Sequence, residues 1–218
     1  MKKYLQQFLG LLTPGVRILL GVLTLVYLVA LAGKLTTAFH CDDWLSLSAR
    51  QFWDGQVWRL LTYALIPAGA LDLVANGFVI ILLGGLLERI QSRGVLWTIC
   101  LISTAGAGVA KVTLQFSIAA PLIGATPMVF GLLAAWCYLC GHEKIAVPLF
   151  GEMLVGHLAL LAGAVSLLGM VISAGLSTAL VMLSGSLSGW FYVWLRRKSF
   201  MYRAARTVHS ERISRLEL

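Results

Sequence analysis

Residues 122–133, LIGATPMVFGLL, place a turn directly before an apolar helix. The turn is Gly124-Ala125-Thr126-Pro127. The first backbone N–H groups of such a helix have no partner within the helix, so the turn can hold negative charge. The predicted helix is one of several long apolar segments. A polar turn at membrane depth must be shielded by protein or line a wet cavity. We therefore take this turn as the candidate functional site.

The composition is that of an integral membrane protein. Of the 218 residues, 59% are hydrophobic and 12% are charged, whereas soluble domains carry roughly 25% charged residues. The net charge of +8 does not indicate nucleic-acid binding, because the basic residues lie at the ends of the apolar segments and in the C-terminal tail. The length predicts one compact helical bundle.

Apolar segments long enough to cross a hydrocarbon core of about 30 Å predict an all-α membrane protein with six transmembrane helices. The expected helices are residues 18–35, 71–87, 95–116, 125–139, 154–172 and 176–195. We expect three parts: an amphipathic cytoplasmic arm (1–17), the six-span domain (18–195) and a basic cytoplasmic tail (196–218) on the anionic inner leaflet.

Two segments between the predicted spans carry most of the other polar residues. Residues 33–67 mix tryptophans with charges of both signs, which is typical of a folded loop at the membrane interface, and 55–67 have a helical pattern. Residues 141–148, GHEKIAVP, are predicted as a plain loop.

The basic residues predict an orientation. Most fall on the side of the membrane that holds both termini, whereas Lys34, Arg50 and Arg59 fall on the other side, with Lys111 at its edge. Basic residues favour the cytoplasm, so we expect both termini to be cytoplasmic and the turn to open toward the outer face. The Lys111 side chain is expected to extend toward the membrane surface.

Short motifs follow one another along the spans. Asp72 and Asn76 are four residues apart and therefore share a helix face. The complete series is Trp58-Arg59, Asp72-x-x-x-Asn76, Gly84-Gly85 with Glu88-Arg89, the turn with Phe130-Gly131, and LSGSLSG at 183–189.

This order of motifs resembles that of the rhomboid intramembrane serine proteases over about residues 18–195. The resemblance implies a six-transmembrane-helix rhomboid-like bundle. It also implies a role for each retained motif. Trp58 and Arg59 would anchor the first loop, Gly124, Ala125 and Asn76 would surround an oxyanion, and Gly131, Gly185 and Gly189 would let helices pack closely.

The positions that match the family's catalytic residues are altered. Thr126 matches the serine nucleophile, Met182 the histidine base and Asp72 the second-span histidine, while Asn76 is retained. A threonine hydroxyl is a weak nucleophile without a base, and Met182 cannot take its proton. Asp72 would repel an oxyanion. We therefore expect no catalytic residues, and a rhomboid-like pseudoprotease that, like the derlins, binds transmembrane client proteins.

Alternatives stay open for the function and for single residues. The chain could be an active serine/threonine-type endopeptidase that uses Thr126, or a small transporter with an ion pathway through Asp72 and Lys111, although no inverted repeat is detectable. Thr126 could be a helix N-cap. Asp72 could be a buried partner of Arg59 or Lys111, or a protonated carboxyl bonded to Asn76.

No cofactor and no metal site are expected. Cys137 and Cys140 form a CxxC pattern within an apolar helix, where buried apolar side chains are the simplest reading. A metal site with His142, Glu143 and His157 is the alternative. The expected partners are transmembrane clients and the lipid bilayer, without nucleic acid, in a bacterial-type inner membrane. The sequence does not predict the oligomeric state.

Overall fold

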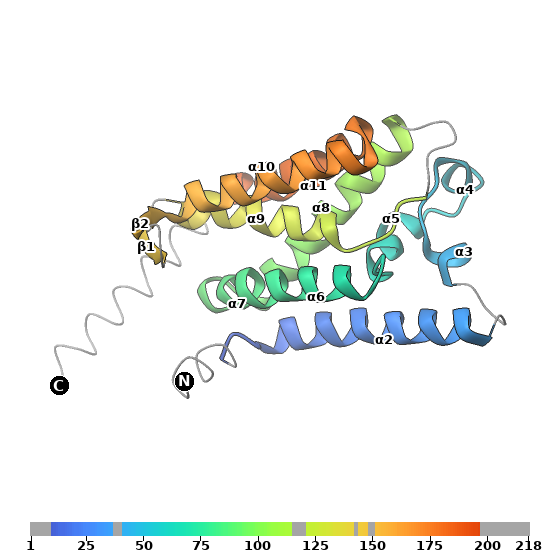
Figure 1. Ribbon diagram of the computed structural model, residues 1–218, viewed down its shortest axis with the longest axis horizontal. Helices are drawn as coiled ribbons and strands as arrows, with labels where there is room; N and C mark the ends of the chain where they lie inside the picture. The colour runs from blue at the N-terminus through green and yellow to red at the C-terminus, as the bar shows by residue number, and fades with distance from the viewer. Residues whose placement is uncertain (1–9, 37–40, 115–120, 142–143, 148–150, 197–218) are drawn as a thin grey trace.

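The computed structural model describes residues 10–36, 41–114, 121–141, 144–147 and 151–196, and it is mainly helical (Figure 1). The predicted arm up to residue 9 and the tail from residue 197 lie outside the described residues, so the predictions for them stay untested.

Within the described residues, four helices are long and apolar enough to cross a membrane. They are α2 (Pro14–Thr36), the continuous helix Ala70–Ile90, α8 (Arg93–Leu114) and α11 (Leu176–Leu195). The helix Ala70–Ile90 consists of α6 (Ala70–Val79), a π-helical turn η2 (Ile80–Gly84) and α7 (Gly85–Ile90). The prediction of a helical integral membrane protein is confirmed.

Two further apolar helices belong to the bundle. These are α9 (Thr126–Cys140), which has 15 residues, and α10 (Val155–Ala174). Because α9 is shorter than a usual span of about 20 residues, the count of six spans stays a prediction.

The predicted loop at 141–148 is wrong in part. Lys144–Val147 forms strand β1, which pairs antiparallel with β2 (Gly151–Leu154), from Lys144 opposite Leu154 to Val147 opposite Gly151. The β-branched residues Ile145 and Val147 favour a strand, and a nearby second segment completes the pair. Sequence reading by hydropathy does not detect a hairpin this short.

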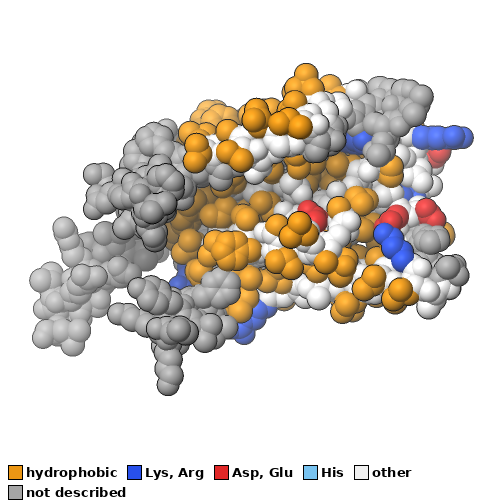
Figure 2. Space-filling model, in the orientation of Figure 1, with side chains coloured by type: hydrophobic (Ala, Val, Ile, Leu, Met, Phe, Trp, Pro, Cys, Tyr) orange, Lys and Arg blue, Asp and Glu red, His pale blue; other side chains and the backbone are white. Residues whose placement is uncertain are grey.

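The helices are arranged as a bundle with α2 along one side (Figure 1). α2 contacts α6, η2, α7 and α8, while α9 contacts α8, α10, α11 and η2. Hydrophobic side chains cover the middle of the visible face, and most charged side chains lie nearer its two ends (Figure 2). This distribution suits a molecule surrounded by a hydrocarbon layer.

Small residues let α8, α9 and α11 approach closely. A Cβ atom at Gly131 would overlap the Ser103 hydroxyl, and one at Gly189 would lie 2.7 Å from the same oxygen. A Cβ atom at Gly185 would lie 3.1 Å from the Pro127 carbonyl oxygen. Larger side chains at these three glycines would push the helices apart.

The segment between α2 and α6 folds into short helices at one end of the bundle (Figure 1). These are α3 (Cys41–Leu45), α4 (Ala49–Trp53), α5 (Arg59–Thr62) and the 3-10 turn η1 (Tyr63–Leu65). The exposed Trp44, Trp53 and Trp58 suit a position in the headgroup region.

Candidate functional site

The turn before α9 is fastened to the first loop by backbone hydrogen bonds. Leu47 and Leu122 exchange N–H···O bonds of 3.0 and 2.8 Å. The Gly124 N–H donates to the Tyr63 carbonyl at 3.1 Å, and Gly124 has a φ of 107°, which favours glycine. The first loop therefore sets the position of the turn.

Tyr63 ties this junction to α8. Its side chain is fully buried, and its hydroxyl donates to the Thr104 carbonyl at 2.8 Å. Burial raises the pKa of the Tyr63 hydroxyl, so it remains a neutral donor. The sequence analysis did not identify Tyr63 as a structural residue. A single aromatic residue between two polar stretches is only a weak indication of such a role.

Arg59 organises the first loop from a buried position. Its guanidinium donates to the Ser46 carbonyl at 2.6 Å, to the Asp43 carbonyl at 2.5 Å and to Gln56 Oε1 at 2.6 Å. Burial lowers the pKa of Arg59, while the Asp43 carboxylate acts in the opposite direction. The neighbouring Trp58 is half-exposed, and its role as an anchor of the loop stays a prediction.

Three of the predicted site residues meet at the start of α9, and we call Asp72, Asn76 and Thr126 the Asp72 cluster. Asn76 Nδ2 donates to Asp72 Oδ1 at 2.8 Å and to Thr126 Oγ1 at 3.4 Å, and the Thr126 hydroxyl donates to Asp72 Oδ1 at 3.4 Å. Asp72 Oδ2 also accepts from the Ala68 N–H at 3.1 Å. The N–H···O bond that the Thr126 hydroxyl accepts and the O–H···O bond that it donates are both longer than usual, so the hydroxyl is held loosely.

The reading of Thr126 as a helix N-cap is wrong. The cap position is Ala125, which makes no side-chain cap hydrogen bond, and Thr126 is the first residue of α9. Pro127 follows within the first turn, where its missing N–H costs nothing. The threonine side chain is turned instead toward Asp72 and Asn76 on α6.

The hydrogen bonds of Asp72 show which of the three partners considered for it is in contact with it. Asp72 bonds Asn76, whereas the guanidinium of Arg59 is occupied within the first loop. In the described part of the chain no basic nitrogen lies within ion-pair distance of Asp72. Lys111 is 5% exposed and forms no ion pair with Asp72, and its extension toward the membrane surface stays a prediction.

Met182 lies in the buried core, one helical turn before Gly185 on α11. Gly185 in turn approaches the backbone of Pro127, the residue after Thr126. The position that the rhomboid resemblance assigns to the histidine base is thus on the helix that packs against the start of α9. In this chain it holds a thioether side chain. A thioether sulfur is at most a weak hydrogen-bond acceptor and removes no proton from a hydroxyl.

The CxxC pair shows no sign of a metal centre within the described residues. Cys137 is half-buried, Cys140 is buried and neither forms a disulfide. The other suggested ligands, His142, Glu143 and the side chain of His157, lie outside the described residues. No group of three metal-ligating side chains occurs in the part of the chain that is described.

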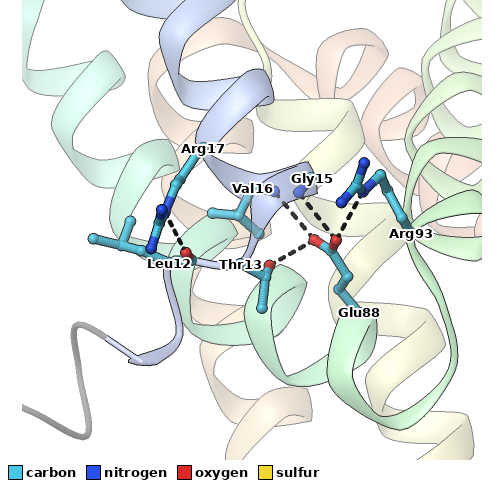
Figure 3. A network of polar contacts seen from close by, with 7 residues as sticks. All are labelled: Leu12, Thr13, Gly15, Val16, Arg17, Glu88 and Arg93. Carbon is cyan, nitrogen blue, oxygen red and sulfur yellow. Dashed lines mark hydrogen bonds and ion pairs between the residues drawn. The ribbon is translucent and has the colours of Figure 1, made fainter.

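A second polar cluster, which sequence reasoning missed, lies at the other end of the helix Ala70–Ile90 (Figure 3). Its centre is the Glu88 carboxylate, which accepts from the Thr13 hydroxyl at 2.5 Å, the Gly15 N–H at 3.0 Å, the Val16 N–H at 3.2 Å and Arg93 Nε at 3.2 Å. We call these five residues the Glu88 cluster.

Glu88 in effect caps α2 from a neighbouring helix. A carboxylate at a helix amino end satisfies free N–H groups and complements the helix dipole. The Thr13-Pro14 start of α2 and the polar Glu88 at the end of an apolar segment were the signals available in the sequence. Arg17 supports the same end of α2 through its Nε, which donates to the Leu12 carbonyl at 2.6 Å (Figure 3).

Residues 17–199 match the model of a family described as "Eukaryotic integral membrane protein (DUF1751)". No curated protein matches the chain. The family match covers the Asp72 cluster, Glu88, Arg93 and all the predicted spans.

The family description corrects the expected location. The expectation of a bacterial-type inner membrane is wrong, because the matching family consists of eukaryotic integral membrane proteins. Hydropathy and the placement of basic residues follow the same rules in both kinds of membrane, so they could not have separated them. The side on which the termini lie stays a prediction.

Proposed function

The chain belongs to the eukaryotic integral membrane protein family, and we propose that it is a rhomboid-like, proteolytically inactive protein that binds the transmembrane segments of client proteins. The proposal includes a bundle of six spans within residues 18–195, with α9 and α10 as the fourth and fifth. Residues 1–17 and 196–218 would form its arm and tail.

The observation that carries the proposal is the set of partners around the Thr126 hydroxyl. This hydroxyl contacts a carboxylate and an amide, and α11 holds buried Met182 at the position that matches the histidine base of the rhomboid proteases. By sequence, α11 contains no histidine. A positioned base contributes roughly 10²–10⁴ to the rate of such reactions, so its loss removes most of the catalysis.

The exposed face of α6 supports the client-binding part of the proposal. Leu71, Val74 and Phe78 recur at spacings of three and four residues, and each is more than half exposed. Such a stripe is wide enough for another helix to pack along it. The proposed path for a client lies between α6 and α10, as the rhomboid resemblance implies.

The activity test uses the purified full chain in liposomes with labelled transmembrane peptide substrates and a serine-directed phosphonate. We expect neither cleavage nor labelling. Restored cleavage should require Thr126→Ser, Met182→His and Asp72→His together, because nucleophile and base act as a unit. Each single change serves as a control and should have almost no effect.

The alternative is an active peptidase with Thr126 as nucleophile. One observation favours it, since the Thr126 hydroxyl donates to Asp72 Oδ1 at 3.4 Å, so a carboxylate lies in position to accept the hydroxyl proton. Cleavage by the unmodified protein that is lost in Thr126→Ala would establish this alternative and remove the pseudoprotease proposal.

Client binding is tested with a photo-crosslinking side chain at Val74 and a model apolar transmembrane peptide in the same vesicles. The matched control is Leu25 on α2, which is 62% exposed compared with 67% for Val74. We expect the peptide to be captured from Val74 and much less from Leu25. Equal capture from both positions would mean that α6 offers no specific surface.

A further inference from the structure

We propose that Asp72 makes the proposed client-binding face of α6 (Leu71, Val74 and Phe78) selective for certain transmembrane helices. These are helices that carry a Lys or Arg side chain at the level of Asp72. The inference rests on the proposed client binding and adds a chemical class of client. It starts from the hydrogen-bond donors that surround the carboxylate.

All donors to Asp72 in the described part of the chain are neutral. They are the Ala68 N–H, the Asn76 amide and the Thr126 hydroxyl. These groups orient the carboxylate but leave its charge without a cation, although the amino ends of α6 and α9 contribute partial positive charge. A charged group within a span is costly unless it is paired or meets water.

The same chain treats its other helix-end carboxylate differently. Glu88 has Arg93 at 3.2 Å in addition to two backbone N–H groups and a hydroxyl. The hydrogen bonds and the counter-charge that the Glu88 carboxylate needs are therefore supplied within the protein. Asp72 lacks the corresponding cation, so an incoming basic side chain would supply the missing component.

The location of Asp72 makes it reachable from the lipid side. Leu71 is 83% exposed and begins the apolar stripe on α6, whereas Asn76 is 8% exposed and lies inside the bundle. Successive helical residues differ by about 100°, so Asp72 lies at the edge between these two faces. Asp72 is itself half-buried.

A helix packed on the α6 stripe would have its axis about 8–10 Å away. Lysine and arginine have long side chains that run along apolar surface to reach a polar partner. A basic residue on such a helix can therefore reach the open side of Asp72 while its apolar stem covers the stripe. Charge-assisted hydrogen bonds to carboxylates are stronger than neutral ones, which gives the site its preference.

The test uses the full chain in phosphatidylcholine vesicles with three fluorescent peptides. Each peptide is an apolar helix of about 24 residues, long enough to span the bilayer. The peptides are identical except for Lys, Gln or Glu at one position near one end. Binding is measured by energy transfer to an acceptor fused to the C-terminus of the chain.

We expect the Lys peptide to bind about tenfold more tightly than the Gln peptide, and the Glu peptide to bind most weakly. Asp72→Asn should remove the preference for Lys. Asp72→Glu should retain it. The matched control is Asp54→Asn, which neutralises an exposed carboxylate in the first loop and should leave the preference unchanged.

The outcomes separate this inference from client binding itself. Equal binding of the Lys and Gln peptides to the unmodified protein would overturn the inference and leave client binding intact. Absence of binding by every peptide would overturn both. A Lys preference that survives in Asp72→Asn would assign it to another group. The comparison in unmodified protein needs no variant, so it holds even if Asp72→Asn does not fold.

Discussion

The helix Ala70–Ile90 carries a carboxylate near each end, and the two have different surroundings. Glu88, with a side chain 8% exposed, accepts bonds of 2.5–3.2 Å from four groups, one of them the cation of Arg93. Asp72 accepts bonds of 2.8–3.4 Å from neutral groups and is half-buried.

The difference separates a structural carboxylate from one that is available to a ligand. Glu88 joins α7 to the amino end of α2 and, within the described residues, is surrounded by the chain's own donors (Figure 3). Asp72 joins α6 to α9 more loosely, beside an exposed apolar stripe. Changes in the Glu88 cluster should therefore cost stability, while changes in the Asp72 cluster should mainly alter binding.

The largest expected loss is for Glu88→Ala. We expect the free energy of unfolding in mixed micelles to fall by about 3 kcal/mol, because two N–H groups, a hydroxyl and a guanidinium lose their acceptor. The control Asp54→Ala removes an exposed carboxylate and should change it by less than about 0.5 kcal/mol. Similar losses of unfolding free energy for the two variants would show that Glu88 does not hold α7 and α2 together.

Gly85→Ala tests the packing at the same end of the helix Ala70–Ile90, because it adds one methyl group and changes no charge. A Cβ atom at Gly85 would overlap the Leu11 carbonyl oxygen, which should cost about 2 kcal/mol and displace the segment before α2. Gly21→Ala is the control, since nothing lies within 4 Å of a Cβ atom there. Gly21→Ala should be neutral or stabilising by up to about 1 kcal/mol. Equal unfolding free energies for both variants would contradict this account.

The isosteric change Asp72→Asn should cost about 1 kcal/mol in the same unfolding assay. The reason is that its donors are neutral and its carboxylate is partly solvated, so loss of the charge breaks no ion pair. Glu88→Gln is the matched comparison and should cost about twice as much. If Asp72→Asn proved the more destabilising of the two, the contrast between the two ends would be reversed.

Thr126→Ala should have the smallest effect, about 0.5 kcal/mol or less, since both contacts of its hydroxyl are 3.4 Å long. Thr126→Ser keeps the hydroxyl and serves as the control. A loss of unfolding free energy above about 1.5 kcal/mol for Thr126→Ala would show that the hydroxyl makes strong structural hydrogen bonds. The Asp72 cluster would then resemble the Glu88 cluster.

Several features of the fold could be predicted because they depend on neighbours along the chain. The helix at 176–195 was expected with the bounds that the structure has, and α6 carries Asp72 and Asn76 on one face, as their spacing implies. Other local readings failed. Thr126 is not a cap, because its hydroxyl finds partners on α6, and strand β1 forms only through pairing with β2.

The sequence by itself determined that this is a helical membrane protein, because hydrophobicity summed over one segment decides whether that segment enters the bilayer. The tertiary structure decided what the polar residues do. Thr126 lies 54 residues from Asp72, and Thr13 lies 75 residues from Glu88. Only packing of the helices brings such groups within hydrogen-bond distance, and in an apolar medium the partners that each polar group finds decide whether it serves stability or binding.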